Sequence, residues 1–571
     1  MSLTSALNTA IASLQVNQSA ISLLSSNVAH ANDPNYTKKT LATESLYNGP
    51  NQPGGITVAG YANAVNEAMR KQYEALTAQS STTSTTSDYL SRVQNILGSS
   101  TDSASLPSLL SDFTAAWQQY QANPDSATAQ QQVVSLGQRF AASVNDAATQ
   151  IDSLDNDVKN DTDNSVKSLN DLLEQVYNIN VQLKGTSAND AGRGTLIDQR
   201  DALVRQVAQL VDVRTIERSD GTVSLFTTGG MSLLDGAPRK FSFDGTNVID
   251  VESNQVVSSQ IRDGQLRAEL DFRMDNSSLN QPASSNPGTE VIRKLKSQLD
   301  LIASAFTSTT GNPATFASAY NGATASQRVT STFATTVKAT ATSAQSTTVS
   351  LSGTMQAGDV FAVTVNGKTY SYTATSSDTS LDQIASQLAT KVNADSTLGV
   401  TAVAGVGSLQ LVGSNNNVSF DVSTTVNGQI PELTSGFFTG TDRYSFAINA
   451  SLLDGSQQLK RNAASDVVNA LNNSSRNFVA TGLSVTNVSY SGLVSNVIGT
   501  ASTNAKTVSD QAKLNSDTLA MTQQQYQTST GVNLDEEIAN LQVLQNAYAA
   551  SARLLNVIQT MFDTLQQAVS H

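Results

Sequence analysis

The sequence is poor in the side chains that most catalytic sites require. Its 571 residues include no cysteine and only two histidines, His30 and His571. The missing cysteine excludes disulfides, thiolate nucleophiles and zinc sites with cysteine ligands. A catalytic triad would have to use His30, which we interpret as an ordinary residue of the turn around Asn32-Asp33-Pro34. We therefore predict that the chain is not an enzyme and has no metal site and no cofactor.

Charged residues are also scarce, and most of them are acidic. They make up 14% of the chain, where about 25% is usual, and 47 Asp and Glu face 33 Lys and Arg. Because phosphate binding relies on Lys and Arg, this balance argues against a nucleic-acid partner. No apolar run approaches the roughly 18 residues of a membrane span, and Ser2 to Thr37 lacks the basic residues of a targeting signal. We expect no membrane partner, no cleaved signal, and a protein suited to work outside the cell.

The first thirty or so residues carry a narrow apolar seam with the spacing of three and four that is typical of a coiled coil. The opposite face is polar and has no basic residue, whereas a helix that lies on a membrane normally has Lys or Arg there. We therefore expect a protein partner, with Asn17 as a buried residue that fixes the register. The apolar positions of the seam are Leu3, Leu7, Ala10, Leu14, Ile21, Leu24 and Val28.

The last segment carries a second seam of the same kind. Asn533 and Glu536 form a capping signature, and acidic residues follow where a helix dipole is positive. Two such seams suggest that the terminal helices pair with each other, either within one molecule or between copies. Their long, thinly charged outer surfaces favour packing against further copies, so we predict a polymerisation interface. Its C-terminal positions are Leu534, Ile538, Leu541, Leu544, Tyr548, Leu555, Ile558, Phe562, Leu565 and Val569.

Helical and strand-rich regions alternate between the two ends. The periodicity predicts one or two long helices from about Ser126 to Lys184, another from Leu196 to Leu210, and then a hairpin of Val213–Glu217 with Val223–Phe226 around an Asp220-Gly221 turn. The Ser/Thr run from Gln79 to Ser87 has the composition of a loop, although packing could continue a helix through it.

A separate small unit, rich in strands, is predicted from about Val337 to Thr425, with one helix from Leu381 to Val392. The stretch Thr342 to Thr348 beside its strands reads as a linker or an edge strand. The fold class is therefore α+β with several domains. We predict four parts: 1–40 plus 525–571, a coiled-coil polymerisation domain; 41–212 plus 455–524, a helical bundle; 213–336 plus 426–454, a β-rich domain with a helix; and 337–425, an inserted surface domain.

Three motifs that suggest chemistry have simpler interpretations. The aspartates Asp155, Asp157, Asp161 and Asp163 lack the glycine and glutamate of a calcium loop, so a solvated helix face is preferred. Gly405-Val406-Gly407 lacks the third glycine of a dinucleotide fingerprint and is a turn. The charged residues of Asp198-Gln199-Arg200-Asp201 have no nucleophile or base beside them and indicate a surface or interface ion-pair cluster.

Two motifs at opposite ends of the chain belong together. The first part contains Ser26-Asn27-Val28-Ala29 and Asn32-Asp33-Pro34-Asn35-Tyr36-Thr37-Lys38. The last part contains Gly531-Val532-Asn533-Leu534-Asp535-Glu536-Glu537, followed by Gln545 and Tyr548. Together they resemble the terminal signatures of bacterial flagellar rod, hook and hook-associated proteins. Asn35 stands where the family usually has glycine and tolerates a left-handed backbone, and Lys38 stands where arginine is usual.

Three internal stretches narrow the resemblance to the hook-associated proteins. They are Leu196 to Asp201 leading to Gly229-Gly230, Gly264-Gln265-Leu266 with Leu270 to Arg273, and Gly436-Phe437-Phe438-Thr439-Gly440. The resemblance covers the chain except for roughly residues 310 to 430. It implies a structural junction protein between the flagellar hook and the filament, whose terminal helices form a coiled-coil layer and whose other domains project outward.

The resemblance also implies the partners and the route of such a protein. It would contact further copies of itself, the hook protein and the next hook-associated junction protein, after export in unfolded form by the flagellar type III apparatus. An export chaperone would cover its C-terminal helix beforehand. Two alternatives remain at this point: a hook or rod subunit of the same axial group, or a secreted adhesin-like surface protein that uses the inserted unit at 337–425.

Overall fold

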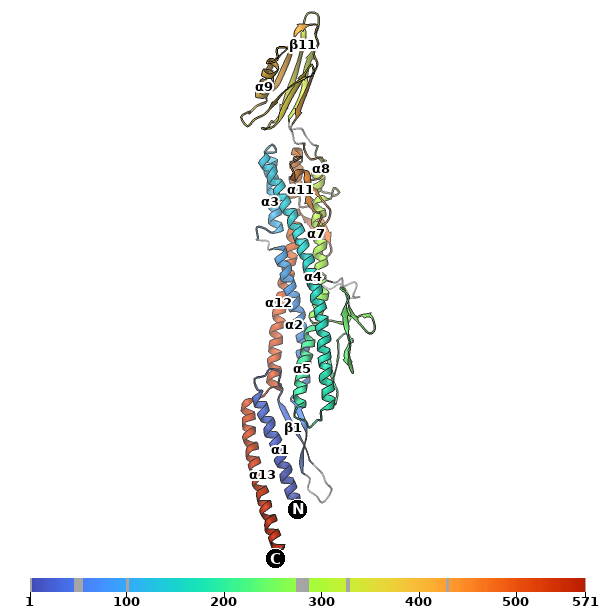
Figure 1. Cartoon of the computed structure of the whole chain (residues 1–571), viewed down its shortest axis with the longest axis vertical. Helices are drawn as coiled ribbons and strands as arrows, with labels where there is room; N and C mark the ends of the chain where they lie inside the picture. The colour runs from blue at the N-terminus through green and yellow to red at the C-terminus, as the bar shows by residue number, and fades with distance from the viewer. Residues whose placement is uncertain are drawn as a thin grey trace. The chain divides into compact units, whose positions relative to one another are not determined.

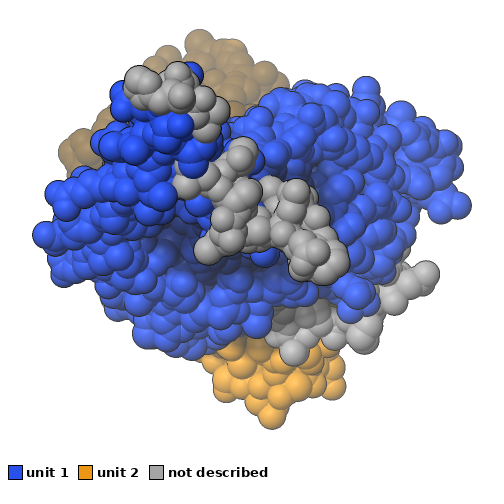
Figure 2. Space-filling view, turned by 90° about the horizontal axis from the view of Figure 1, so that it is seen from below, with its two compact units in different colours: residues 1–96, 151–295, 500–571 blue, residues 97–150, 296–499 orange. Residues whose placement is uncertain are grey.

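The computed structural model describes residues 3–45, 55–98, 102–273, 287–324, 329–427 and 431–569. The chain divides into two compact units, residues 1–96, 151–295 and 500–571, and residues 97–150 and 296–499 (Figure 2). Helices and mostly antiparallel sheets alternate along it, so the prediction of an α+β chain with several domains is confirmed. The four-part division of the sequence stays a prediction.

The first unit combines long helices with short strands. Its helices include α4, a single helix of 59 residues where one or two were predicted. Of these helices, α4 and α12 contribute residues to both units, as does α2 with its last residue, Leu97. Its elements are α1 (Leu3–Ala29), β1 (Lys39–Ser45), β2 (Ile56–Asn63), α2 (Glu67–Leu97), α4 (Ala127–Gly185), α5 (Arg193–Leu210), β3 (Arg214–Glu217), β4 (Val223–Phe226), β5 (Ser232–Asp235), β6 (Ala237–Pro238), β7 (Phe241–Phe243), β8 (Val248–Asp250), β9 (Gln255–Val256), η1 (Ser258–Gln260), α6 (Gln265–Arg273), α12 (Tyr490–Thr530) and α13 (Leu534–Val569).

The two terminal helices, α1 and α13, lie side by side and run in opposite directions (Figure 1). The predicted cap at the start of α13 is confirmed, because Asn533 Oδ1 accepts hydrogen bonds from the backbone amides of Asp535 at 3.1 Å and Glu536 at 3.4 Å. The β1–β2 hairpin pairs antiparallel and follows directly from the turn after α1. The two ends of the chain thus meet in one element pair, as the two seams predicted.

The Ser/Thr run from Gln79 to Ser87 is helical and lies inside α2. Its hydroxyl groups donate to carbonyl oxygens one turn earlier, for example Thr82 to Ala78 at 3.0 Å and Thr86 to Thr82 at 2.8 Å. Thr82 also accepts a hydrogen bond of 2.6 Å from the amide of Gly264, just before α6. Gly264 has a φ of +96° and no room for a side chain, since a Cβ would lie 2.5 Å from the Leu210 carbonyl. Tertiary contacts of this kind outweigh the poor helix propensity of the run.

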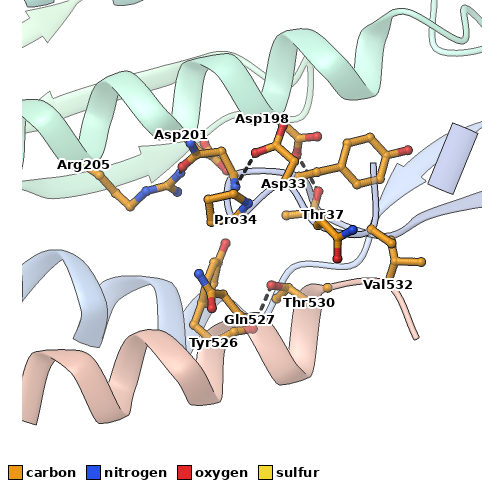
Figure 3. Close-up of a pocket in the computed structure, with 15 residues that line it drawn as sticks. Asp33, Pro34, Thr37, Asp198, Asp201, Arg205, Tyr526, Gln527, Thr530 and Val532 are labelled. Atoms are coloured by element: carbon orange, nitrogen blue, oxygen red, sulfur yellow. Dashed lines mark hydrogen bonds between the residues drawn. The ribbon is translucent and has the colours of Figure 1, made fainter. Parts of the chain in front are cut away.

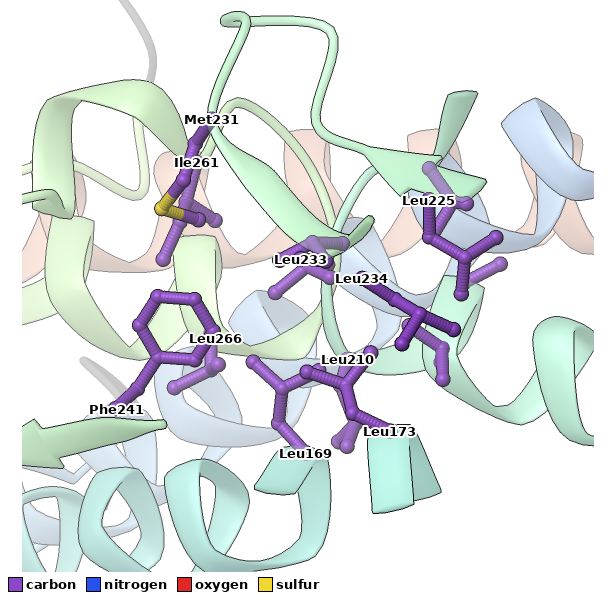
Figure 4. Close-up of a cluster of buried hydrophobic side chains, with 14 of the residues drawn as sticks. Leu169, Leu173, Leu210, Leu225, Met231, Leu233, Leu234, Phe241, Ile261 and Leu266 are labelled. Atoms are coloured by element: carbon purple, nitrogen blue, oxygen red, sulfur yellow. The ribbon is translucent and has the colours of Figure 1, made fainter. Parts of the chain in front are cut away.

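The core of the first unit joins its short strands to three helices (Figure 4). The predicted hairpin of β3 and β4 is present, and Gly221 in its turn has a φ of +78°. Apolar side chains from α4, α5 and α6 pack against those from the strands, and the labelled ones are Leu169, Leu173, Leu210, Leu225, Met231, Leu233, Leu234, Phe241, Ile261 and Leu266. This core holds α5 in place and therefore positions the residues of the candidate site described below.

The second unit has an aromatic core. Trp117 is fully buried and meets Phe316, Tyr320 and Phe437 edge-on at centroid distances of 6.0, 6.0 and 5.5 Å, an arrangement that aromatic rings prefer. The helical and hairpin elements around this core are α3 (Leu106–Ala122), α7 (Val291–Thr307), α8 (Phe316–Gly322), β17 (Phe438–Thr439), β18 (Ala447–Ile448), α10 (Ala450–Leu453), η3 (Arg461–Ala463), α11 (Ala464–Asn472), β19 (Arg476–Ala480) and β20 (Leu483–Val488).

The predicted small unit of strands and one helix is part of the second unit. It has a sheet in the order β10-β11-β15-β14, a second sheet in the order β13-β12-β16, and α9 packed on them around its own apolar core. The stretch Thr342 to Thr348 was predicted as a linker or an edge strand; this is wrong, because it enters β11, which pairs on both sides. The elements are β10 (Val329–Val337), β11 (Ala344–Gly353), β12 (Val360–Val365), β13 (Lys368–Thr373), α9 (Leu381–Asn393), β14 (Val400–Gly405), β15 (Ser408–Asn416) and β16 (Val422–Asn427).

Candidate assembly site at the chain ends

The N-terminal and C-terminal motifs contact each other at the end of α1 and the start of α13. Asn27 Nδ2 donates a hydrogen bond of 2.9 Å to Glu537 Oε2, although the two residues are 510 positions apart. Both side chains are buried. A carboxylate in such a place is stable only when donors satisfy it, and the amide of Asn27 supplies one of them. We call this contact, together with the partners described next, the terminal clasp.

Both the oxygen and the nitrogen of the Asn27 side-chain amide make hydrogen bonds. Its Oδ1 accepts hydrogen bonds from the Tyr36 hydroxyl at 2.9 Å and from the Lys39 amide at 3.2 Å, and its Nδ2 also donates to the Lys39 carbonyl at 3.0 Å. The side chain therefore mimics a strand partner for β1 while it binds Glu537. A buried amide that uses donors and acceptors together fixes the geometry of α1, the turn and α13 at one point.

Lys38 closes the clasp from the other side. Its ammonium group lies 2.9 Å from Glu536 Oε1 and 3.0 Å from Glu537 Oε1, and its backbone amide donates to the Thr530 carbonyl at 2.7 Å. Burial lowers the pKa of Lys38, but the hydrogen bonds to Glu536 and Glu537 outweigh it and hold the pKa above its ordinary value. Lys38 therefore pairs with two carboxylates, at the position where arginine is usual in the family that the sequence resembles.

A second cluster anchors the clasp to α5. Lys39 Nζ lies 2.6 Å from Asp198 Oδ2, and Asp198 also accepts hydrogen bonds from Thr37 at 2.5 Å and Asn63 at 2.9 Å. Beside it, Arg200 pairs with Asp201 at 2.7 Å. These aspartates and Arg200 are buried, so the predicted ion-pair cluster is confirmed, and of its two predicted settings, a surface or an interface, the surface of the single chain is excluded. Lys39 and Asn63 of the β1–β2 hairpin and Arg70 of α2 cover these aspartates, which the residue spacing on α5 did not reveal.

A polar cavity of about 190 Å³ lies between the turn after α1, α5 and the end of α12 (Figure 3). Gly531 closes the end of α12, where a Cβ would come within 2.4 Å of the Gln527 carbonyl oxygen. Asn35, at the rim, accepts a hydrogen bond of 2.7 Å from Arg205. Asn35 does not use the left-handed backbone that it tolerates, because it is absent from the described non-glycine residues with positive φ.

The predicted seam residues divide into two sets. On α1, the described members Leu7, Leu14, Ile21, Leu24 and Val28 are half-buried, and Asn17 is half-buried rather than buried as predicted. The buried apolar positions among the described side chains of α1 are Ala10, which belongs to the predicted seam, and Ala20 and Leu23, which do not. On α13, Leu541, Leu544, Leu555 and Phe562 are half-buried and Ile558 is buried, whereas Leu534, Ile538, Tyr548 and Leu565 are exposed.

The sequence analysis missed a second apolar seam on α13. Val543, Leu554, Val557 and Met561 are 65%, 53%, 56% and 51% exposed. Together with Ala550 they lie at intervals of seven, four, three and four residues, which places them on one helix face, different from that of the half-buried set. We call these five positions the outer seam. The signal was present in the sequence, but a helix with two seams cannot be recognised by following only the one that begins at Leu534.

The residues that suggested chemistry in the sequence make structural contacts with other side chains. His30 stacks on Tyr36 with the ring centroids 4.9 Å apart, and His571 lies outside the described residues. The four aspartates of α4 point to separate partners: Asp155 to Arg273, Asp157 to Arg92, Asp161 to Tyr89 and Asp163 to Lys167. Within the described ranges there is no group of three or more His, Cys, Asp or Glu suited to a metal ion, and no helix with the length and apolarity to cross a bilayer.

Comparison with known proteins places these features in a family context. The family model of the flagellar hook-associated protein FlgK helical domain matches residues 90–327, and that of the flagellar basal body rod FlgEFG protein C-terminal region matches residues 523–568. Flagellar hook-associated protein 1 of Salmonella typhimurium is 26% identical, with 99% of each chain covered. The protein of that name from Escherichia coli is 25% identical over 42% of this chain and 44% of the relative. The structure of the flagellar hook junction protein FlgK from Burkholderia pseudomallei has a TM-score of 0.46 at 14% identity, covering 80% of this chain and 99% of that one.

Proposed function

We propose that this chain, which is 26% identical to flagellar hook-associated protein 1 of Salmonella typhimurium, is a structural component of the flagellar axis and joins the flagellar hook to the filament. The relatives bear the name of a structural protein, so the proposal concerns assembly rather than catalysis. The C-terminal match to a rod-protein model supports a terminal region shared among axial proteins. In this proposal α1 and α13 polymerise into a layer of the axis, and the seam residues predicted from the sequence form part of the contacts.

The observation that carries the proposal is that α13 has two apolar faces. One face is half-buried against α1, and the other, the outer seam, is exposed in a single chain. Burying a large apolar side chain stabilises a complex by about 1.5–3 kcal/mol. The four large apolar residues of the outer seam lie along one face of a helix with few charges, and they therefore favour a protein partner. A second copy that offers α1 or α13 is the partner expected in an axial assembly.

The proposed partners follow from the same helix. Copies of the chain, the hook protein and the next hook-associated junction protein would meet the layer of terminal helices. Before export, a chaperone would cover the outer seam, because an exposed apolar seam invites premature association. A chain without cysteine forms no disulfides that would block its passage through a narrow channel in unfolded form. The protein would then work outside the cell, at the junction.

A deletion strain tests the junction directly. Cells that lack the chain are expected to assemble hooks but to shed filament subunits into the medium, and a plasmid copy should restore attached filaments. Electron microscopy of the hooks and immunoblotting of the medium provide the two readings. If hooks are missing as well, the chain is a hook or rod subunit. If filaments stay attached without it, the junction proposal fails.

A further inference from the structure

An open pocket of about 320 Å³ lies in the second unit and shares no residue with the terminal clasp. It is bounded by the end of α7, the loop before α8, the start of β19 and the first residue of α12. Small-molecule sites combine apolar walls with a few well-placed polar groups and have volumes from about 300 Å³ upward. This pocket meets both criteria, since the rings of Phe478 and Tyr490 line it together with the hydroxyl groups of Ser304 and Ser308.

The pocket contains a buried positive charge. Arg476, the first residue of β19, is 5% exposed and is the one charged residue of the pocket's described lining. Its Nη1 donates to the Asn473 carbonyl at 3.0 Å and its Nη2 donates to the Ala314 carbonyl, whereas its buried Nε has no hydrogen-bond partner among the described residues. The guanidinium carbon lies 4.7 Å from the centre of the Tyr490 ring. A ring attracts a cation, but neither a ring nor a carbonyl carries the net negative charge that a buried guanidinium requires.

The described part of the chain offers no anion to balance this charge. No Asp or Glu occurs in residues 301–316 or 472–490, the two segments that line the pocket. Asp300, directly before the first segment, is already paired with Arg443 at 2.6 Å. Burial raises the pKa of the Tyr490 phenol, although the neighbouring guanidinium opposes the shift, so the hydroxyl stays protonated and donates to a backbone carbonyl at 3.1 Å. The counter-charge therefore has to come from a bound molecule.

We propose that this pocket binds a small monocarboxylate that carries hydroxyl groups, and that a carboxylate oxygen accepts the Nε–H of Arg476. A single negative charge neutralises a single guanidinium, whereas a phosphate dianion would leave a second charge without a partner. The half-buried Ser304 and Ser308, and the exposed amide of Asn477, supply donors and acceptors for the hydroxyl groups. The Phe478 ring supplies an apolar surface for the carbon skeleton. This site is independent of the proposed function and goes beyond it.

Glucuronate and glucose are suitable probes, because they share a hydroxylated ring and differ in the carboxylate. In saturation-transfer NMR of the full chain, glucuronate is expected to bind with a Kd of about 1 mM, the affinity that a ligand of this size reaches at the usual efficiency per atom. Glucose should bind at least about tenfold more weakly, because it leaves Arg476 without an anion. Inorganic phosphate at equal concentration should displace little of the glucuronate. The inference is overturned if glucuronate does not bind, if glucose binds as tightly, or if phosphate displaces most of the glucuronate.

Two variants assign the binding to this pocket. Arg476→Gln removes the guanidinium and should abolish glucuronate binding, but it also loses the contacts with two backbone carbonyls. Asn477→Asp keeps these contacts and the acceptor for the Asn487 amide at 3.1 Å. Its added negative charge is expected to weaken glucuronate binding about fivefold, with an unchanged melting temperature.

The matched control for Asn477→Asp is Asn496→Asp, the same change at an exposed position of α12 outside the pocket's described lining. It should bind glucuronate like the natural chain. Equal affinities of the Asn477→Asp and Asn496→Asp proteins overturn the inference and leave the proposed function intact.

Discussion

At the scale of single residues, the terminal clasp is the feature on which the chain ends depend. Asn27, Tyr36, Lys38 and Glu537 form one hydrogen-bonded group in which each buried polar atom has a defined role. The resemblance pointed to all four residues, because they lie in the two terminal motifs. Their pairing could not be predicted, since no spacing rule connects residues 510 positions apart. Each motif can be recognised in the sequence, whereas the contact between the two motifs can be recognised only in the folded chain.

Replacing the central amide should loosen both ends at once. Asn27→Ala removes the donor to Glu537 Oε2 and the acceptor of the Lys39 amide, while Lys38 still holds Glu537 Oε1, and each unsatisfied group costs about 1–3 kcal/mol. We expect the free energy of unfolding of the α1–α13 pair to fall by roughly 3 kcal/mol, seen as an earlier first transition in a circular dichroism melt. Ser22→Ala, at an exposed position of α1, is the control. Equal melts of the two variants would contradict the role of the clasp.

A second residue, Glu269 of α6, makes stability depend on pH. Burial raises the pKa of Glu269 to about 8, although hydrogen bonds from Gln265 and Ser165 oppose the shift. The folded chain therefore holds this proton more tightly than the unfolded chain, so the stabilisation is complete below the ordinary glutamate pKa and is lost as the pH rises to about 8. Relative to Glu269→Gln, the natural chain should lose about 1 kcal/mol per pH unit across that window. Urea midpoints of both proteins, measured from pH 5 to pH 8, check this, and a constant difference would refute it.

At the scale of elements, periodicity predicted the helices better than composition did. The apolar spacing of Leu169, Leu173 and Val176 correctly indicated α4. The Ser/Thr composition of Gln79 to Ser87 argued for a loop, but hydroxyl-to-carbonyl bonds and the contact with Gly264 keep it helical. Thr342 to Thr348 looked peripheral and enters a central strand, β11. A polar composition shows that a segment tolerates contact with water. It does not show whether other elements pack over the segment, and this packing decides its secondary structure.

The outer seam of α13 gives an element-scale prediction. Val557→Lys places a charge on an exposed apolar position, so the fold of the single chain should be unaffected while the contact between copies is lost. We expect the concentration needed for assembly to rise at least about tenfold, which corresponds to about 1.4 kcal/mol. Asn556→Lys adds the same charge at the exposed neighbouring position and serves as the control. Sedimentation and electron microscopy measure the polymer, and a Val557→Lys chain that assembles like the control would exclude the outer seam.

At the scale of the whole molecule, the small strand-rich unit at 329–427 has the features of a separable domain, although the match to the Salmonella typhimurium relative covers 99% of this chain. Ser331 Oγ on β10 lies 3.1 Å from Thr424 Oγ1 on β16, so the chain enters and leaves this unit through adjacent strands. The unit has its own apolar core. Insertions with these properties are usually removable, as expected for the inserted surface domain that the sequence predicts.

Removal of that unit should therefore leave assembly intact. A chain in which a short Gly/Ser linker replaces 329–427 is expected to fold and to support motility, with the loss of the Gln356 hydrogen bond to the Asp125 carbonyl as its main structural cost. Swimming assays in the complemented deletion strain measure this. Shed filaments would show that the unit belongs to the junction, and normal filaments with lost surface attachment would favour the adhesin-like role for it.

We propose that the terminal helices form the assembly domain. The terminal clasp holds them together at one point, and neighbouring copies complete their packing. Isolated seams bury too little apolar area to offset the entropy of ordering. Amide hydrogen exchange of α1 and α13, compared between purified monomer and polymer, tests this most directly. We expect rapid exchange in the monomer away from the clasp, in Leu7–Ala20 and Leu541–Gln567, and strong protection of both stretches in the polymer. Strong protection already in the monomer, or no gain on assembly, would contradict it.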